Sequence, residues 1–99
     1  ILDPPRFVAN RAQKPKGLRA YKDINLWALK LLSPGGLLAT FSCSGLVTAT
    51  ELRTAVAWAA LDAGRIVRVL ETFSQAPDHP ILLSAPESDY LKGLLCLAT

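Results

Sequence analysis

Residues 35–51, GGLLATFSCSGLVTATE, contain the three signals that decide the fold. After the two glycines, the apolar run from Leu37 to Phe41 has the length and composition of a buried strand of a parallel sheet. The small residues from Ser42 to Gly45 indicate a turn at its carboxyl end. Thr48 and Glu51 have the spacing of a capping box, which marks the start of a helix. The stretch therefore predicts strand, turn and helix in succession, the repeating unit of an α/β fold.

The chain before this stretch follows the same alternation. Ile1 and Leu2 run into Asp3-Pro4-Pro5, and because two prolines cannot continue a sheet ladder, we expect a strand to end at Asp3. Residues 6–17 are polar, basic and without a period, which predicts a loop. An amphipathic helix of about four turns should follow. Its expected apolar face holds Leu18, Tyr21, Ile24, Ala28 and Leu31, with Trp27 and Leu32 beside them, and its polar face holds Arg19, Lys22, Asp23 and Lys30.

The chain after the capping box completes the sheet. The second helix should run to about Ala63 with Gly64 as its carboxyl cap, and residues 66–70 predict a third strand. The remaining expected elements are a break at 75–80, a short strand segment at 81–83, a turn at 86–89 and a final strand from Tyr90 to Leu97. The order of strands and helices along the chain indicates an α/β sheet that is parallel at first and is closed by an antiparallel hairpin-like pair.

Length and composition limit what the protein can be. Its 99 residues form at most one small domain, and because 51% are hydrophobic and 19% charged, some apolar surface should face a partner. The chain has no methionine, so we interpret it as a fragment. The longest apolar run is too short to span a membrane, and no signal peptide is recognisable at residue 1. We therefore expect a cytoplasmic protein with reduced thiols at Cys43 and Cys96.

Basic residues gather near the start of the chain. The formal net charge is only +3, yet six cations lie between residues 6 and 22 with no acid among them. Such an excess suits the phosphate backbone of a nucleic acid, although a solvated loop and first helical turn would explain it equally well. These residues are Arg6, Arg11, Lys14, Lys16, Arg19 and Lys22.

Two chemically suggestive segments should meet at one edge of the sheet. Ligands of open α/β sheets bind beyond the carboxyl ends of the strands, where Asp3-Pro4-Pro5 and Ser42-Cys43-Ser44 are both expected. A carboxylate and a thiol suit a substrate such as cytosine, whose carbon 5 becomes nucleophilic once a thiolate adds to carbon 6. A lone cysteine among small residues is more often structural, so the spacing alone leaves both interpretations open.

Five segments together resemble bacterial ribosomal RNA large-subunit cytosine-5 methyltransferases. The resemblance extends over nearly the whole chain, from Ile1 to Cys96. The segments are LDPPRF (2–7), GLRAYKDINLWALKLLSPGG (17–36), FSCSG (41–45), QAPDHP (75–80) and ESDYLKG (87–93).

This resemblance implies a fold, a cofactor and a set of site residues. Residues 1–99 would be the carboxyl-terminal half of a Rossmann-like methyltransferase domain, with parallel strands, two helices and an antiparallel last strand. The cofactor would be S-adenosylmethionine and the substrate ribosomal RNA. The half that binds most of the methyl donor lies outside this sequence, so the fragment alone should be inactive. Cys43 would be the nucleophile and Asp3 a second catalytic residue; Asp3 and Pro4 would flank the cofactor, and Pro4, Pro5, Phe7 and Lys92 the substrate.

Several alternatives remain open at this point. The aspartate-proline-proline-aromatic signature also resembles methyltransferases of exocyclic amino groups, which need no cysteine; Cys43 favours carbon methylation. Phe7 could stack on an extruded base or pack in the core. Alone, the fragment could act as an association module that forms a homo-oligomer through its unpaired strand edge, or as an RNA-binding module.

The remaining conspicuous residues have modest expectations. His79 could be a general base but is more readily a structural loop residue. Lys92 could contact phosphate or be solvated. Cys96 should be an inert core residue, and we assign Trp27 and Trp58 to packing. No metal-ligand spacing occurs, so we expect no metal.

Overall fold

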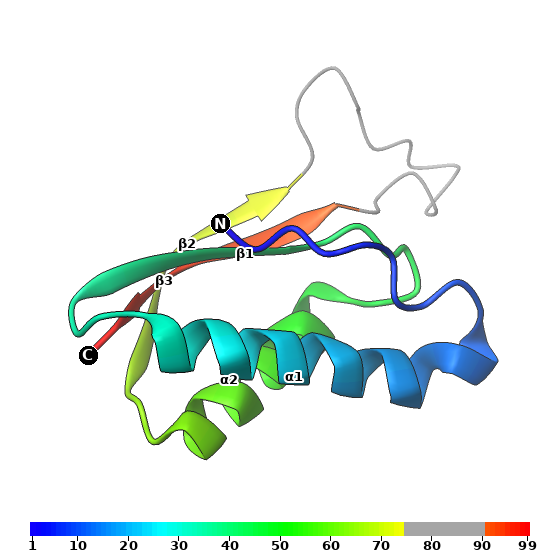
Figure 1. Cartoon of the computed structure of the whole chain (residues 1–99). Coiled ribbons are helices and arrows are strands. Elements are labelled where there is room, and N and C mark those ends of the chain that lie inside the picture. Colours follow the sequence, from blue (N-terminus) through cyan, green and yellow to red (C-terminus); the bar gives the residue numbers. More distant parts are fainter. Residues whose placement is uncertain (75–90) are drawn as a thin grey trace.

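Two helices lie side by side on one face of a three-stranded sheet (Figure 1). The computed structural model describes residues 1–74 and 91–99. The expected break, strand segment and turn between residues 75 and 89, together with His79 and Tyr90, lie outside the described residues. The elements are the 3-10 helix η1 (Arg11–Gln13), α1 (Lys14–Leu31), β1 (Gly36–Ser42), α2 (Ala49–Ala63), β2 (Val67–Ser74) and β3 (Lys92–Ala98).

The strand order in the sheet is β1-β3-β2, so the last strand is the central one. β3 runs antiparallel to both neighbours, which confirms the antiparallel last strand. β1 and β2 point the same way but are not neighbours, because β3 takes the hydrogen bonds that a parallel partner would have used. The expected parallel pairing is therefore not confirmed for these strands. Within the described ranges it is limited to a bridge between Leu2 and Thr40, which is all that forms of the expected first strand.

The sequence signals at both ends of α2 are confirmed. The Thr48 hydroxyl accepts a hydrogen bond from the Glu51 amide at 3.0 Å, and the Glu51 carboxylate accepts one from the Thr48 amide at 3.0 Å. This reciprocal pair satisfies two amide groups that a helix start would otherwise leave unbonded. At the other end Gly64 takes a left-handed conformation with φ 68°, which glycine adopts without steric cost.

The capping box makes stability depend on the charge of Glu51. Burial raises the pKa of this carboxyl. The hydrogen bond from the Thr48 amide and the Lys14 ammonium, 2.9 Å away, together lower the pKa by more than burial raises it, so the net pKa lies below its usual value of 4.5. A carboxyl whose pKa is lower in the folded than in the unfolded chain stabilises the fold above the unfolded pKa and loses this effect as pH falls. We expect Glu51→Gln, which keeps the hydrogen-bond acceptor, to lower the free energy of unfolding at pH 7 and to have little effect at pH 3. Urea unfolding at both pH values measures this; equal effects at both would contradict it.

α1 begins earlier than the hydrophobic period predicts, so the expected loop over residues 6–17 is wrong in its second half. The Asn10 side chain accepts a hydrogen bond from the Gln13 amide at 3.1 Å, and the helix starts at Lys14. Pro15 lies in the first helical turn, where its missing N–H costs nothing. The basic residues around it are therefore part of an ordered helix start.

The buried face of α1 also differs from the predicted one. Leu31, expected on the apolar face, is 84% exposed. The buried residues of α1 include two polar ones, Lys22 and Asn25. Lys22 is buried because its ammonium lies 2.6 Å from the Asp62 carboxylate and 4.7 Å from the centre of the Trp58 ring, so it joins α1 to α2. The buried residues of α1 are Gly17, Tyr21, Lys22, Asn25 and Leu29.

The tryptophans are on the helices, as expected, but they are not in the core. Trp27 is 63% exposed with the Lys30 ammonium 5.0 Å from its ring centre, and Trp58 is 46% exposed. Cys96, in contrast, is fully buried, which confirms its place in the core. In the described part of the chain, neither helix combines the length and the hydropathy of a membrane-spanning segment.

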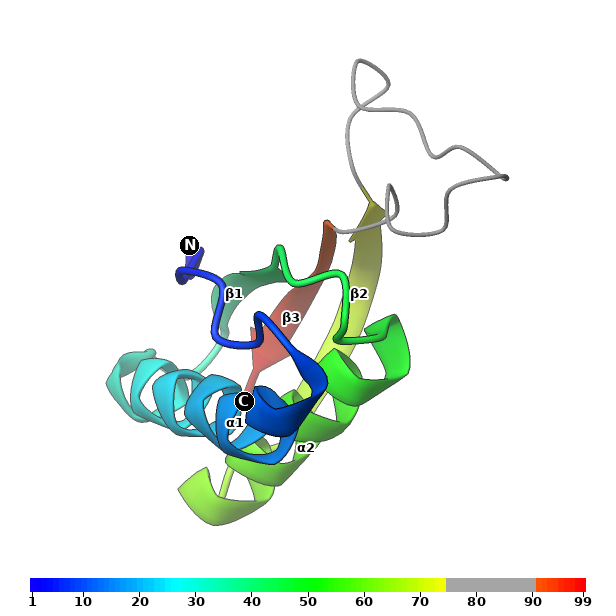
Figure 2. The ribbon, with the colours of Figure 1, turned by 90° about the vertical axis from the view of Figure 1, so that its right-hand side faces the viewer.

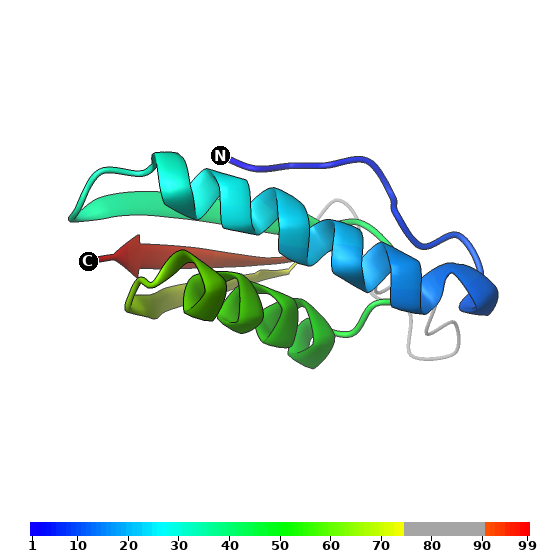
Figure 3. The same cartoon turned by 60° about the horizontal axis from the view of Figure 1, so that its bottom comes forward.

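The two faces of the sheet have different surroundings. α1 and α2 both cover the same face (Figure 2), and the view from below shows them in front of the strands (Figure 3). On the opposite face the rings of Phe41 and Phe73 stack with centroids 5.7 Å apart, and both residues pair with Gly93 of β3. A Cβ on Gly93 would lie 2.4 Å from the Phe41 ring, so a glycine is needed where the two rings meet.

Candidate functional site

The amino-terminal segment and the end of β1 meet at one edge of the sheet, as the sequence predicts. The Leu2 amide donates to the Ala39 carbonyl at 2.7 Å, and the Phe41 amide donates to the Leu2 carbonyl at 3.0 Å. The two segments are parallel at this bridge, so both continue beyond it in the same direction. Asp3 and Cys43 therefore follow neighbouring strand ends.

Two buried serines hold the turn that carries Cys43. The Ser42 hydroxyl donates to the Tyr21 hydroxyl at 3.0 Å and accepts a bond from the Ser44 amide at 3.3 Å. The Ser44 hydroxyl donates to the Val8 carbonyl at 2.5 Å. Both serines are fully buried, whereas Cys43 between them is half-buried. Cys43 is thus a partly exposed residue in a turn whose two serines are fixed by hydrogen bonds.

Lys92 supports the same turn from β3. Its side chain is 8% exposed, and its ammonium donates to the Ser44 carbonyl at 2.6 Å. The bond links the first residue of β3 to the turn that ends β1. The expected phosphate contact of Lys92 stays a prediction. In the structure its ammonium stabilises the turn through the bond to the Ser44 carbonyl.

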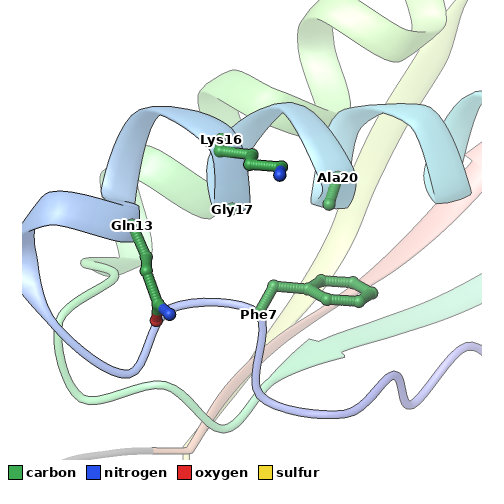
Figure 4. A pocket seen from close by; sticks show the side chains of 5 residues that line it. All are labelled: Phe7, Gln13, Lys16, Gly17 and Ala20. Carbon is green, nitrogen blue, oxygen red and sulfur yellow. The ribbon is translucent and has the colours of Figure 1, made fainter.

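Phe7 has a packing role, and its expected stacking on a base stays a prediction. One side of its ring packs against Tyr21, edge to face, with centroids 4.8 Å apart and planes at 70°. It also borders a groove of about 260 Å³ between the amino-terminal segment and α1, which is lined by Gln13, Lys16, Gly17 and Ala20 as well (Figure 4). Phe7 is therefore partly a packing residue and partly an accessible aromatic surface.

The other residues singled out near Asp3 lie at the same edge with different exposure. Asp3 and Pro5 are exposed, whereas Pro4 is buried. Asp3 is thus open to a ligand beyond the strand end, which suits a group that holds a base edge or a cofactor. Its chemical role, like those of Pro4 and Pro5, stays a prediction.

The six cations of the amino-terminal third divide into two groups. Lys14 and Lys22 pair with Glu51 and Asp62, so they act in the fold. The other four side chains are available on the surface; Arg6, Arg11, Lys16 and Arg19 are exposed. No cluster of three metal-binding side chains occurs within residues 1–74 and 91–99.

Sequence reasoning missed the hydroxyl groups around the nucleophile candidate. Tyr21 was expected on the apolar face of its helix, and its hydroxyl proves to be the partner of Ser42. The signal in the sequence is the pair of serines on either side of Cys43. Small polar residues at a buried strand end need hydrogen-bond partners, which must come from the segments packed against them.

Another hydroxyl on this face of β1, that of Thr40, has no such partner. Thr40 is fully buried, and its hydroxyl lacks a hydrogen bond in the described part of the structure. Because an unbonded buried hydroxyl is costly, we expect Thr40→Val, which keeps the shape, to raise the free energy of unfolding by about 1 kcal/mol. Urea unfolding measures this, and the same change at the exposed Thr72 of β2 is the control. A loss of stability at Thr40 would show that its hydroxyl does find a partner.

Comparison with known proteins gives a consistent result. The chain is 54% identical to "Ribosomal RNA large subunit methyltransferase I" of Pseudoalteromonas atlantica over 96 residues, which is 97% of this chain and 24% of that protein. The protein of the same name from Cronobacter sakazakii is also 54% identical over 96 residues, with the same shares covered, and that from Salmonella arizonae is 53% identical. The chain is similar to ribosomal RNA large subunit methyltransferases over almost its whole length. It spans about a quarter of their length. No protein-family model matches.

Solved structures support the fold. SMU.776, assigned as a methyltransferase and crystallised with SAH, matches with a TM-score of 0.77 at 18% identity, over 97% of this chain and 24% of that one. A SAM-dependent methyltransferase structure from Streptococcus mutans matches with a TM-score of 0.76, also at 18% identity. The chain thus has a Rossmann-like α/β fold that matches one part of these two structures.

Proposed function

We propose that this chain is the carboxyl-terminal part of an S-adenosylmethionine-dependent methyltransferase that methylates carbon 5 of a cytosine in large-subunit ribosomal RNA. The observation that carries the proposal is the half-buried Cys43, fixed between two buried serines beside the Asp3-Pro4-Pro5 segment. The similarity to ribosomal RNA methyltransferases supports the substrate class.

The arrangement is suited to covalent catalysis. The Cys43 thiolate attacks carbon 6 of the cytosine, which makes carbon 5 nucleophilic. Asp3 and the carbonyl group of Pro4 or Pro5 hold the base edge during this attack. Carbon 5 would take the methyl group from the sulfonium of the donor, which leaves as the neutral thioether; a base then removes the proton from carbon 5, and elimination breaks the bond between the Cys43 sulfur and carbon 6. Cys43 is free again after each turnover.

The methyl donor would be held only in part by this chain. S-adenosylmethionine supplies an activated methyl group on a sulfonium centre. Asp3 is exposed directly beyond a strand end, the place where open α/β sheets bind ligands, so Asp3 fits a position beside the donor, whereas Pro4, proposed for the same place, has a buried side chain. The chain has no glycine-rich donor loop, and the remaining donor contacts belong to the rest of the protein.

The alternative of exocyclic amino methylation uses the same Asp3-Pro4-Pro5 segment but gives the cysteine no task. Ser42, Ser44, Tyr21 and Lys92 are all bonded into the turn that presents the thiol. A turn held this firmly around an accessible cysteine favours carbon methylation.

The surface cations suit the proposed RNA substrate. Lys16 lines the groove beside Phe7, and the exposed Arg6, Arg11 and Arg19 are close in sequence to its lining residues, so phosphate groups and a stacked base could both be held there. We infer that RNA approaches over the start of α1. Whether the protein is oligomeric stays a prediction that size-exclusion mass tests.

The test is to identify the product made by the full-length protein. Ribosomal RNA is incubated with the labelled donor, and the modified nucleoside is identified by mass spectrometry; we expect 5-methylcytidine. RNA that carries 5-fluorocytosine should trap a covalent complex through Cys43, because the fluorine on carbon 5 cannot leave as a proton does. A methylated exocyclic amine without a trapped complex would sink the proposal.

A further inference from the structure

We infer that Tyr21 is a positioning residue, whose buried hydroxyl sets the distance between the nucleophile Cys43 and the Asp3–Phe7 segment that faces the base. This inference rests on the proposed function. It concerns a helix residue that does not itself touch the reacting atoms.

The Tyr21 hydroxyl is the joint between the two segments of the site. It lies 3.0 Å from the Ser42 hydroxyl, at the end of β1, and 3.5 Å from the Phe7 amide, in the amino-terminal segment. The whole side chain is excluded from solvent. A phenol in a core needs partners for its oxygen, and the Ser42 bond, the long Phe7 amide contact and the packing of the Phe7 ring against the Tyr21 ring together hold both segments against α1.

A continuous set of bonds connects this joint to Cys43. The Tyr21 hydroxyl bonds to the Ser42 hydroxyl, which in turn accepts from the Ser44 amide. The Ser44 hydroxyl returns to the amino-terminal segment at the Val8 carbonyl. Both residues next to Cys43 are therefore tied to the segment that carries Asp3 and Phe7.

The chemistry requires this separation to be constant. The sulfur must lie over carbon 6 while the opposite edge of the same ring is held by Asp3, so an error in their separation cannot be corrected by the substrate. Misplacement by about 1 Å is enough to cost about a hundredfold in rate. A joint within the protein therefore affects the attack step more than it affects RNA binding.

The structure provides a matched control on the same strand. Thr40 and Ser42 are both fully buried on the helix-facing side of β1, but only Ser42 bonds to Tyr21. Tyr21→Phe and Thr40→Val each remove one buried hydroxyl and keep the shape. Only the first removes the joint.

The experiment compares these two variants in the full-length protein. For Tyr21→Phe we expect kcat, and the rate of covalent capture by 5-fluorocytosine RNA, to fall by about ten- to a hundredfold, with the RNA dissociation constant unchanged. We also expect iodoacetamide to alkylate Cys43 faster, because the turn is less firmly held. Peptide mapping measures the alkylation of this cysteine. Thr40→Val should leave all four quantities unchanged.

The outcomes separate this inference from the proposed function. An unchanged capture rate and alkylation rate in Tyr21→Phe would overturn the inference even if Cys43 proves essential. If Cys43 proves dispensable, the proposed function fails, and the alkylation rates still decide whether Tyr21 holds the turn. Should Tyr21→Phe fail to fold, Ser42→Ala breaks the same bond from the other side and is expected to give the same losses.

Discussion

Methyl transfer by the full-length protein should fall by at least about a thousandfold when Cys43 is replaced with alanine, because in the proposed mechanism its sulfur forms the bond to carbon 6 and the other cysteine of this sequence, Cys96, is buried. The structure supports a large effect on rate and a small one on folding. The side chain is half-buried, and the turn is held by its serines, not by the thiol. Single-turnover transfer of a labelled methyl group, with RNA affinity measured separately, gives the result.

The second cysteine is the control for this experiment. Cys96 is fully buried in β3, and burial raises the pKa of its thiol, so it should not form a thiolate at neutral pH. Cys96→Ala is expected to keep kcat and to lose some stability through the space it leaves. Retained activity in Cys43→Ala, or equal losses in both variants, would remove Cys43 from the mechanism.

A methyl group added at Gly17 should have the largest effect on stability. In most helix positions glycine is worse than alanine, so replacing it gains up to about 1 kcal/mol. At Gly17, however, a Cβ would lie 2.2 Å from a methyl carbon of Val8 and 2.8 Å from the Phe7 carbonyl oxygen. We expect Gly17→Ala to lower the free energy of unfolding by about 3 kcal/mol, or to detach the amino-terminal segment from α1. Urea unfolding and the hydrogen exchange of the backbone amides of that segment distinguish the two.

A second substitution tests this explanation. Val8→Ala removes the closest atom, so in the Gly17→Ala background it should recover part of the stability, although Val8→Ala alone is destabilising. The Phe7 carbonyl is backbone and cannot give way, so recovery should be incomplete. Additive losses in the double variant would show that the contact with Val8 is not the cause.

Elements marked by specific residues were predictable from the sequence. The capping box of Thr48 and Glu51, the left-handed Gly64 and the strand that precedes Cys43 all formed where expected. These signals depend on contacts within a few residues, and for that reason a sequence shows them. The meeting of the Asp3 and Cys43 segments was also predictable, since ligand sites of α/β sheets follow a topological rule.

Features that depend on distant partners were not predictable. The central position of β3 depends on its pairing with two strands at once, and nothing within residues 92–98 encodes it. The buried face of α1 was misplaced because Lys22 finds its partner, Asp62, on another helix. The Tyr21 hydroxyl was missed for the same reason, as its partner Ser42 lies 21 residues away.

The place of β3 has a consequence for synthesis on the ribosome. β1 and β2 emerge first, yet neither can bond to the other, because the gap between them belongs to β3. The sheet therefore closes in one late step, when β3 fills both edges together, and such long-range pairing is slow. Lys92 is the first residue of β3 and bonds to the Ser44 carbonyl, so the turn that carries the proposed nucleophile receives this support only at that moment. A nascent chain without β3 has the Cys43 thiol but lacks the bond from β3 that supports its turn.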